Sequence, residues 1–189
     1  MILPIYVYGA PILREETHTV ETNSEELQQL IDDMIETMRG AEGIGLAAPQ
    51  VGRPERLFVV DLTPMQEEAE EEGIELPPQP MVFINPEIVW ESEEDAEFEE
   101  GCLSIPDLRE QIIRPESVRI AYLDRDFAPQ ELEVGALLSR VVQHEFDHLE
   151  GILFIDRISA FKRRLLGRRL REMARGNVEA DYPLSTSAA

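Results

Sequence analysis

Two histidines in the second half of the chain have the spacing of a metal site. The segment QHEFDHLEG places His144 and His148 four residues apart, so an α-helix would bring both imidazoles to one face. Glu145 lies between them, where its carboxylate could take a proton from water at the metal. Two buried core histidines are the alternative, but the chain has only three histidines and two of them have this spacing. The segment therefore predicts a metal-dependent hydrolase.

A catalytic site of this type needs a third protein ligand and an open position. No histidine or cysteine follows His148, whereas Cys102 precedes it in the segment EGCLS. A lone cysteine is more often a small buried apolar residue, but its thiolate is a strong ligand for soft and borderline metals. We therefore expect Cys102, flanked by Gly101 and Ser104, to be the third ligand. The other candidates are the downstream carboxylates of Glu150, Asp156, Glu172, Glu179 and Asp181.

A third segment, GIGLAAPQ at residues 43–50, is too rich in glycine for a helix. Its small residues let the backbone approach another backbone or a substrate closely. Gln50 at its end offers an uncharged amide N–H, which suits a developing oxyanion. A tight turn packed on a sheet is the alternative, because short glycine patterns are weak signals.

These segments must be positioned by regular elements. Apolar residues at helical spacing predict a helix from about Ser24 to Arg39, with Asn23 and Glu26 as a capping box. Further helices are expected at about 135–150, which carries the two histidines, and at about 159–175. Predicted strands lie at Arg56–Leu62, Met81–Trp90, Glu97–Leu103, Gln111–Arg114, Val118–Leu123 and Glu131–Val134.

Strands that are adjacent in sequence, with few intervening helices, predict an α+β fold. We expect mostly antiparallel sheets around a central metal-binding helix. The 189 residues fit a single catalytic domain over residues 1–176. Within it we expect an exposed acidic loop at 63–80 and a basic C-terminal helix at 157–176, followed by a disordered tail at 177–189.

The N-terminal apolar stretch has no basic leader and is interrupted by Pro4 and Pro11. No other apolar run approaches the ~20 residues that span a membrane. The single cysteine excludes an intramolecular disulfide and suits a reducing compartment. We therefore expect a cytoplasmic protein without a membrane partner.

The chain is strongly acidic, with 39 acidic against 17 basic residues and a net charge of −22. This charge argues against DNA and other general nucleic-acid binding, which needs a basic surface. Adaptation to a salty cytoplasm is the interpretation we favour, because such a surface stays hydrated and screening weakens its self-repulsion. Drift in a GC-rich genome would favour arginine over lysine but would not explain the acidic excess.

Together, GIGLAAPQ, EGCLS and QHEFDHLEG, in this order and with these separations, resemble the signature segments of the peptide deformylase family. The likeness extends to PIYVYGAPILR, IRPESVRI and LFIDR and covers roughly residues 4–158. The acidic segment 63–80 and the acidic surface depart from the family pattern. The resemblance implies an enzyme that removes the formyl group from the N-terminal methionine of nascent proteins and releases formate.

Individual roles follow from the same resemblance. Glu145 corresponds to the catalytic base, and Gln50 and the backbone N–H of Leu103 correspond to the oxyanion donors. Ferrous iron is implied as the native metal, with nickel, cobalt or zinc able to occupy the site, and ligand chemistry alone would allow zinc equally. The residues that correspond to the metal ligands are Cys102, His144 and His148.

Two apolar residues, Leu137 and Val141, share the helical face of His144 because they precede it by seven and three positions. We expect them to line a pocket for the substrate methionine, although ordinary core packing is an equal alternative. By resemblance only, Glu100 and Arg109 are expected to contact the metal ligands or the substrate backbone. The candidate substrate-binding residues are Gly43, Ile44, Gly45, Leu137, Val141 and Arg109.

The basic C-terminal helix predicts a partner. Residues 157–175 carry eight basic side chains and one acidic one, a net charge of +7 that leaves −29 for the rest of the chain. One apolar face should dock on the domain while the other presents the basic side chains. The resemblance suggests contact with ribosomal RNA, whereas the alternative is pairing with the chain's own acidic surface. The apolar stripe consists of Ile158, Phe161, Leu165, Leu166, Leu170 and Met173.

Three other functions stay open at this point. A zinc endopeptidase shares the histidine spacing, but in that class the third ligand usually lies downstream of the second histidine. A cysteine hydrolase would use Cys102 with His144, and a chelator would spare it. A non-catalytic ribosome-associated binding protein would be expected if Glu145 or Gln50 were replaced, and both are present.

Overall fold

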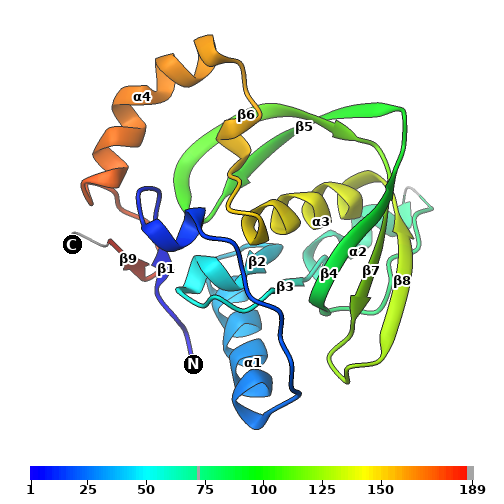
Figure 1. The fold of residues 1–189 in the computed structure, drawn as a ribbon. Helices are drawn as coiled ribbons and strands as arrows, with labels where there is room; N and C mark the ends of the chain where they lie inside the picture. The colour runs from blue at the N-terminus through cyan, green and yellow to red at the C-terminus, as the bar shows by residue number, and fades with distance from the viewer. Residues whose placement is uncertain (72, 187–189) are drawn as a thin grey trace.

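The computed structural model describes residues 1–71 and 73–186, and its largest sheet is antiparallel throughout (Figure 1). Five strands follow the order β2–β3–β4–β7–β8. With the helices around it, this sheet confirms the predicted α+β class. The strands are β2 (Gly45–Ala47), β3 (Leu57–Val60), β4 (Met81–Glu91), β7 (Val118–Leu123) and β8 (Pro129–Val134).

Two smaller sheets accompany the large one. Strand β5 (Asp95–Cys102) pairs antiparallel with β6 (Ile105–Pro115), and β1 (Ile5–Tyr6) pairs parallel with β9 (Leu184–Ser185). β6 extends well beyond the predicted strand at 111–114 because it pairs with β5 along nearly its whole length. The β5–β6 hairpin therefore brings Cys102, at the end of β5, to a sharp turn.

The three predicted helices are all present, with small shifts at their ends. The side chain of Ser24 accepts a hydrogen bond from the N–H of Leu27 at 3.2 Å, so Ser24 is the N-cap of the first helix. The predicted capping box of Asn23 and Glu26 is wrong, because Asn23 instead accepts from Gln28 at 2.7 Å. No helix in the described part of the chain is long and apolar enough to cross a membrane. The helices are α1 (Glu25–Gly40), α2 (Gln66–Glu71), α3 (Ala136–Leu149) and α4 (Ala160–Ala174).

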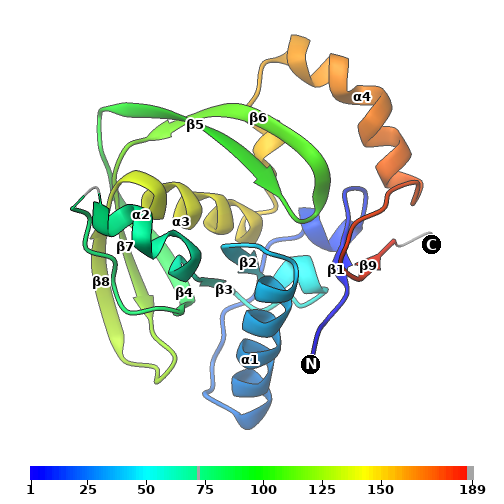
Figure 2. The same ribbon diagram turned by 180° about the vertical axis from the view of Figure 1, so that it is seen from behind.

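Helix α3 lies between the large sheet and the β5–β6 hairpin (Figures 1 and 2). Its apolar side packs with the large sheet in one cluster that includes Phe58, Phe83 and Val142. The opposite side carries polar residues that are buried as well, among them Arg140, which donates to the carbonyl oxygens of β5 and β6. Because α3 is covered on both sides, its histidines are held in a rigid setting.

The acidic segment at 63–80 is largely exposed, but it is not only a loop. It contains a 3-10 turn at Thr63–Met65 and the short helix α2, in which Ala69 is buried. Glutamate, glutamine and alanine are good helix formers, which explains a helical turn in a segment whose acidic, proline-rich composition predicts an exposed loop.

The C-terminal tail departs from the prediction. Strand β9 lies beside β1, where the N–H of Ile5 donates to the carbonyl of Pro183 at 2.9 Å. The predicted disorder is therefore wrong for residues 177–186, and residues 187–189 lie outside the described residues. A strand this short has no periodicity to detect, and its partner lies at the other end of the chain.

Helix α4 docks by only part of its predicted apolar stripe. Leu170 and Met173 are buried in a cluster with Phe154. In contrast, the side chains of Phe161 and Leu165 are 70% and 68% exposed. Figure 1 shows the first turns of α4 at the edge of the molecule. The prediction that the whole stripe docks is therefore wrong, and only the C-terminal half of the helix is anchored.

Candidate active site

The three predicted ligands come together from two elements. The end of β5 supplies Cys102, and α3 supplies His144 and His148. Their ligand atoms all lie within 4.8 Å of one another, and Sγ of Cys102 lies 3.3 Å from Nε2 of His148. A thiolate with two imidazoles is a donor set for a borderline divalent metal ion and leaves a coordination position open. The residues therefore fit the metal that the histidine spacing predicts.

Glu145 lies in the same cluster and is buried, with 4% of its surface exposed. In the described part of the chain, its Oε2 and Nδ1 of His148 are the buried side-chain polar atoms without a hydrogen-bond partner. Burial raises the pKa of Glu145 to about 7. A buried carboxylate without a partner is costly to keep, so its presence beside three ligand atoms points to a chemical role.

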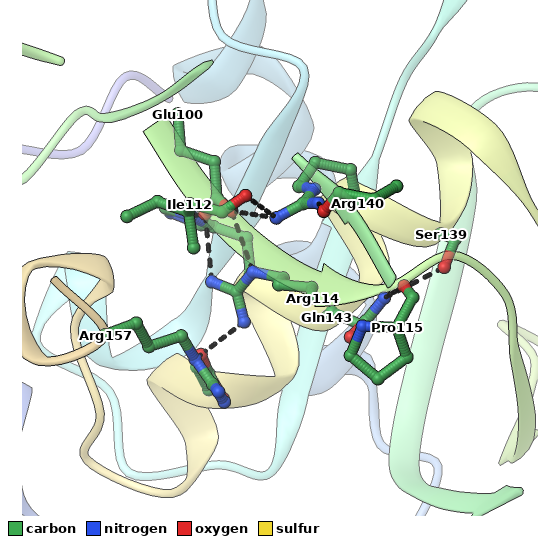
Figure 3. A network of polar contacts seen from close by, with 11 residues as sticks. Glu100, Ile112, Arg114, Pro115, Ser139, Arg140, Gln143 and Arg157 are labelled. Atoms are coloured by element: carbon green, nitrogen blue, oxygen red, sulfur yellow. Dashed lines mark hydrogen bonds and ion pairs between the residues drawn. The ribbon is translucent and has the colours of Figure 1, made fainter. Parts of the chain in front are cut away.

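A buried glutamate orients one of the ligands. Glu100 on β5 accepts from Nδ1 of His144 at 2.8 Å, which leaves Nε2 of that ring available to a metal. Arg114 donates to Glu100 at 2.7 and 2.9 Å, and Arg140 donates at 2.7 Å. Burial alone would raise the pKa of Glu100, but Arg114 and His144 hold it well below its usual range. Figure 3 shows both arginines pointing at Glu100.

The network continues to the surface through a second carboxylate. Asp147 on α3 accepts a hydrogen bond from Arg114 at 2.7 Å. It also accepts two hydrogen bonds from Arg157, one at each carboxylate oxygen and both at 2.6 Å. Sequence reasoning named Glu100 only through the family resemblance and missed these partners. Arg114 lies in the segment IRPESVRI, which is part of the family resemblance. A positive charge in the sequence, however, does not show which carboxylate the arginine will contact.

The glycine-rich segment forms β2 and a 3-10 turn over Ala48–Val51, which fixes the amide of Gln50. Oε1 of Gln50 accepts from the N–H of Ala47 at 2.9 Å. Its Nε2 donates to Oγ of Ser104 at 3.2 Å and lies 3.5 Å from Sγ of Cys102. The predicted tight turn is therefore present, and it aims the amide N–H of Gln50 at the residues around the end of β5.

A cavity of about 1210 Å³ opens beside these residues. Gln50, Cys102, Leu103, His144 and Glu145 all line it. Arg109 is mostly exposed at its rim and lies 3.6 Å from Glu99. All six candidate substrate-binding residues line the same cavity: Gly43, Ile44, Gly45, Leu137, Val141 and Arg109.

Known proteins resemble this chain over nearly its whole length. A family model described as polypeptide deformylase matches residues 2–164. The peptide deformylase of Salinibacter ruber is 68% identical and covers 98% of this chain and 95% of its own length. That of Flavobacterium johnsoniae is 43% identical, with 100% and 98% covered.

Solved structures agree with the fold. The peptide deformylase from Legionella pneumophila has a TM-score of 0.80 at 39% identity and covers 93% of this chain and 96% of its own. The one from Ehrlichia chaffeensis has a TM-score of 0.83 at 35% identity, with 94% and 99% covered. The matched region contains the cysteine and both histidines, and the matches run nearly end to end. The chain belongs to the peptide deformylase family.

Proposed function

We propose that the chain hydrolyses the formyl amide at the N-terminal methionine of nascent proteins at the cavity beside Cys102. Family membership gives the reaction, which removes the N-formyl group and releases formate. One observation carries the assignment of the site: three ligand atoms lie within 4.8 Å of one another, beside the buried Oε2 of Glu145, which has no hydrogen-bond partner among the described residues. An upstream thiolate as third ligand also disfavours an endopeptidase.

The residues divide the chemistry among them. Held by Cys102 and the two histidines, a divalent metal ion would supply Lewis-acid chemistry and lower the pKa of water. Glu145 takes the proton of the attacking water and delivers it to the amine leaving group. The Gln50 amide and the Leu103 backbone N–H stabilise the charge that grows on the carbonyl oxygen.

A product analysis tests this function. A formyl-methionyl tripeptide and its acetylated analogue are incubated with the enzyme under anaerobic conditions. The formylated peptide should yield formate and the tripeptide with a free amino group and unbroken peptide bonds. The acetylated peptide should stay unchanged. Internal cleavage fragments from both peptides would instead indicate an endopeptidase.

We propose ferrous iron as the working metal. One thiolate and two imidazoles accept iron, nickel, cobalt and zinc, and the family resemblance favours iron. Metal analysis of protein purified without oxygen should find mainly iron. Zinc alone in such a preparation would contradict the assignment.

For the substrate, we propose that Ile44, Leu137 and Val141 hold the methionine side chain. Gly43 and Gly45 let the peptide backbone approach, and Arg109 at the rim meets residues further along the peptide. We propose that these sites belong to a single catalytic domain, which comprises residues 1–176 and the tail that pairs with β1. We place the enzyme in the cytoplasm, where formylated nascent chains emerge.

Gly45 should tolerate no side chain. An added methyl group would lie 2.9 Å from Cγ and Cδ of Glu145 and closer still to Oε1. Gly45→Ala is therefore expected to displace the base and lower kcat by at least roughly tenfold, since misplacement by about 1 Å can cost 10²-fold. Gly167→Ala in α4 is the matched control, because an added methyl group there would meet only the end of the Arg171 side chain, at 3.2 Å. A kcat of Gly45→Ala within twofold of the control would show that Glu145 moves aside without loss.

We propose that α4 contacts ribosomal RNA. Part of its charge pairs within the chain, because Lys162 lies 2.9 Å from Glu110 and Arg163 lies 3.0 Å from Asp156. The exposed arginines that form no ion pair with the described residues are Arg164, Arg168, Arg169 and Arg171.

Neutralising this face should weaken ribosome binding but spare catalysis. The triple variant Arg164→Gln, Arg168→Gln and Arg171→Gln is expected to lose co-sedimentation with ribosomes, because phosphate contacts are lost. Its turnover of a free formyl peptide should stay unchanged. The charge-matched control replaces Arg53, Arg119 and Arg125, which lie elsewhere on the surface. Equal co-sedimentation of both triple variants and the wild type would leave α4 without a role in docking.

A further inference from the structure

The C-terminal tail forms part of the wall of the active-site cavity. Four consecutive residues, 179–182, line the cavity together with the metal-site residues. The last of them, Tyr182, is half-buried, and its hydroxyl donates to the carbonyl oxygen of Leu103 at 2.8 Å. Leu103 directly follows Cys102 in the chain. A segment outside the signature motifs therefore touches the backbone beside the site.

Tyr182 is itself held firmly in place. Two residues further along the chain, Leu184 begins the parallel pairing of β9 with β1, which both ribbon views show side by side. Two backbone hydrogen bonds anchor this pair, from Ile5 to Pro183 at 2.9 Å and from Val7 to Ser185 at 3.3 Å. The ring of Tyr182 packs against the same core cluster as the side chain of Leu103. The hydroxyl is therefore a fixed donor.

The N-terminal and C-terminal segments of the chain each donate a hydrogen bond to the turn after Cys102, at successive peptide groups. The carbonyl of Leu103 accepts from Tyr182, and the carbonyl of Ser104 accepts from the N–H of Tyr8 at 2.8 Å. Two rotatable bonds separate the N–H and the carbonyl within one residue. These two bonds lie between the Leu103 carbonyl, which Tyr182 holds, and Cys102, which pairs with Ile105 across the turn. Because both sides are held, the direction in which the Leu103 N–H points is restricted.

We infer that Tyr182 is a positioning residue, whose hydroxyl bond to the Leu103 carbonyl aims the Leu103 N–H at the carbonyl oxygen of the substrate. This inference rests on the proposed function of the cavity and on the proposed role of that N–H as an oxyanion donor. Because the charge on the oxygen grows in the transition state, such positioning acts mainly on kcat and little on KM.

The test replaces only the hydroxyl. In Tyr182→Phe, kcat for a formyl-methionyl peptide should fall roughly fivefold to tenfold, less than the 10²-fold loss of a whole oxyanion donor. KM should stay within twofold. Tyr122→Phe is the matched control, because Tyr122 is also half-buried but packs on Phe83 of the large sheet at a ring-centroid distance of 4.4 Å. The thermal midpoint of Tyr182→Phe should fall by no more than the few degrees that one lost hydrogen bond costs, and the cobalt-substituted forms of both variants should have the visible spectrum of the wild type.

Three outcomes would overturn the inference. They are a kcat of Tyr182→Phe equal to that of the control, a change confined to KM, and a fall in kcat that accompanies an altered cobalt spectrum or a thermal midpoint lowered well beyond the cost of one hydrogen bond. Failure of the proposed function looks different, because the wild-type enzyme would then release no formate in the same assay.

Discussion

Replacement of Glu145 by glutamine is expected to lower kcat for formate release by about 10³-fold, within the 10²–10⁴-fold range of general acid–base catalysis. Glutamine keeps the shape of the side chain but cannot accept the proton of the attacking water. Because Glu145 is buried and its Oε2 has no partner among the described residues, the fold should not suffer. The thermal midpoint should stay the same or rise, since burial penalises the ionised carboxylate.

Metal content is the second readout of the same variant. Glu145 is not one of the three grouped ligand residues, so the purified Glu145→Gln protein should hold as much metal as the wild type. Glu150→Gln, at the end of the same helix, serves as the control and should keep full activity. If Glu145→Gln retained most of the wild-type rate, a different group would be the base.

Replacement of Cys102 should remove the metal together with the activity. Cys102→Ala leaves two imidazoles, and because ligand number largely sets affinity, metal content and kcat should both fall by at least roughly 10²-fold. Cys102→Asp offers a carboxylate oxygen in place of sulfur, so it should bind metal weakly and with an altered preference among iron, cobalt and zinc.

The pair of variants separates two explanations. If Cys102 were a nucleophile, both variants would lose activity, and added metal would restore activity to neither of them. A metal ligand predicts partial recovery in Cys102→Asp when metal is supplied in excess. Full metal content and activity in Cys102→Ala would contradict the assignment of Cys102 as a ligand.

The parts of the site that sequence could predict are those that local geometry determines. Residues four apart on a helix share a face, so the spacing of His144 and His148 predicts two of the three protein ligands of the metal site. The stripe of α1 was equally local, and its helix was predicted to within two residues. The prediction of Cys102 depends on the absence of a histidine or cysteine after His148, and the structure places its sulfur 3.3 Å from Nε2 of His148.

The parts that sequence could not predict depend on contacts between distant segments. The network around Glu100 joins β5, β6 and α3, and nothing in the spacing of Arg114 or Arg140 identifies that carboxylate as their shared partner. The order of the tail comes from the pairing of β9 with β1, and the composition of the tail does not show that partner. In α4, periodicity predicts an apolar stripe, but it does not show how far the domain extends along the helix. Phe161 lies beyond the surface of the domain and is exposed.

A metal titration tests the central claim most directly. The enzyme is stripped of metal with a chelator and then titrated with ferrous iron or cobalt without oxygen, while formate release from a formyl-methionyl peptide is measured. The metal site predicts no formate before the first addition, a linear rise, and a plateau at one ion per chain. Formate release by the stripped enzyme at the wild-type rate would contradict a metal centre on Cys102, His144 and His148.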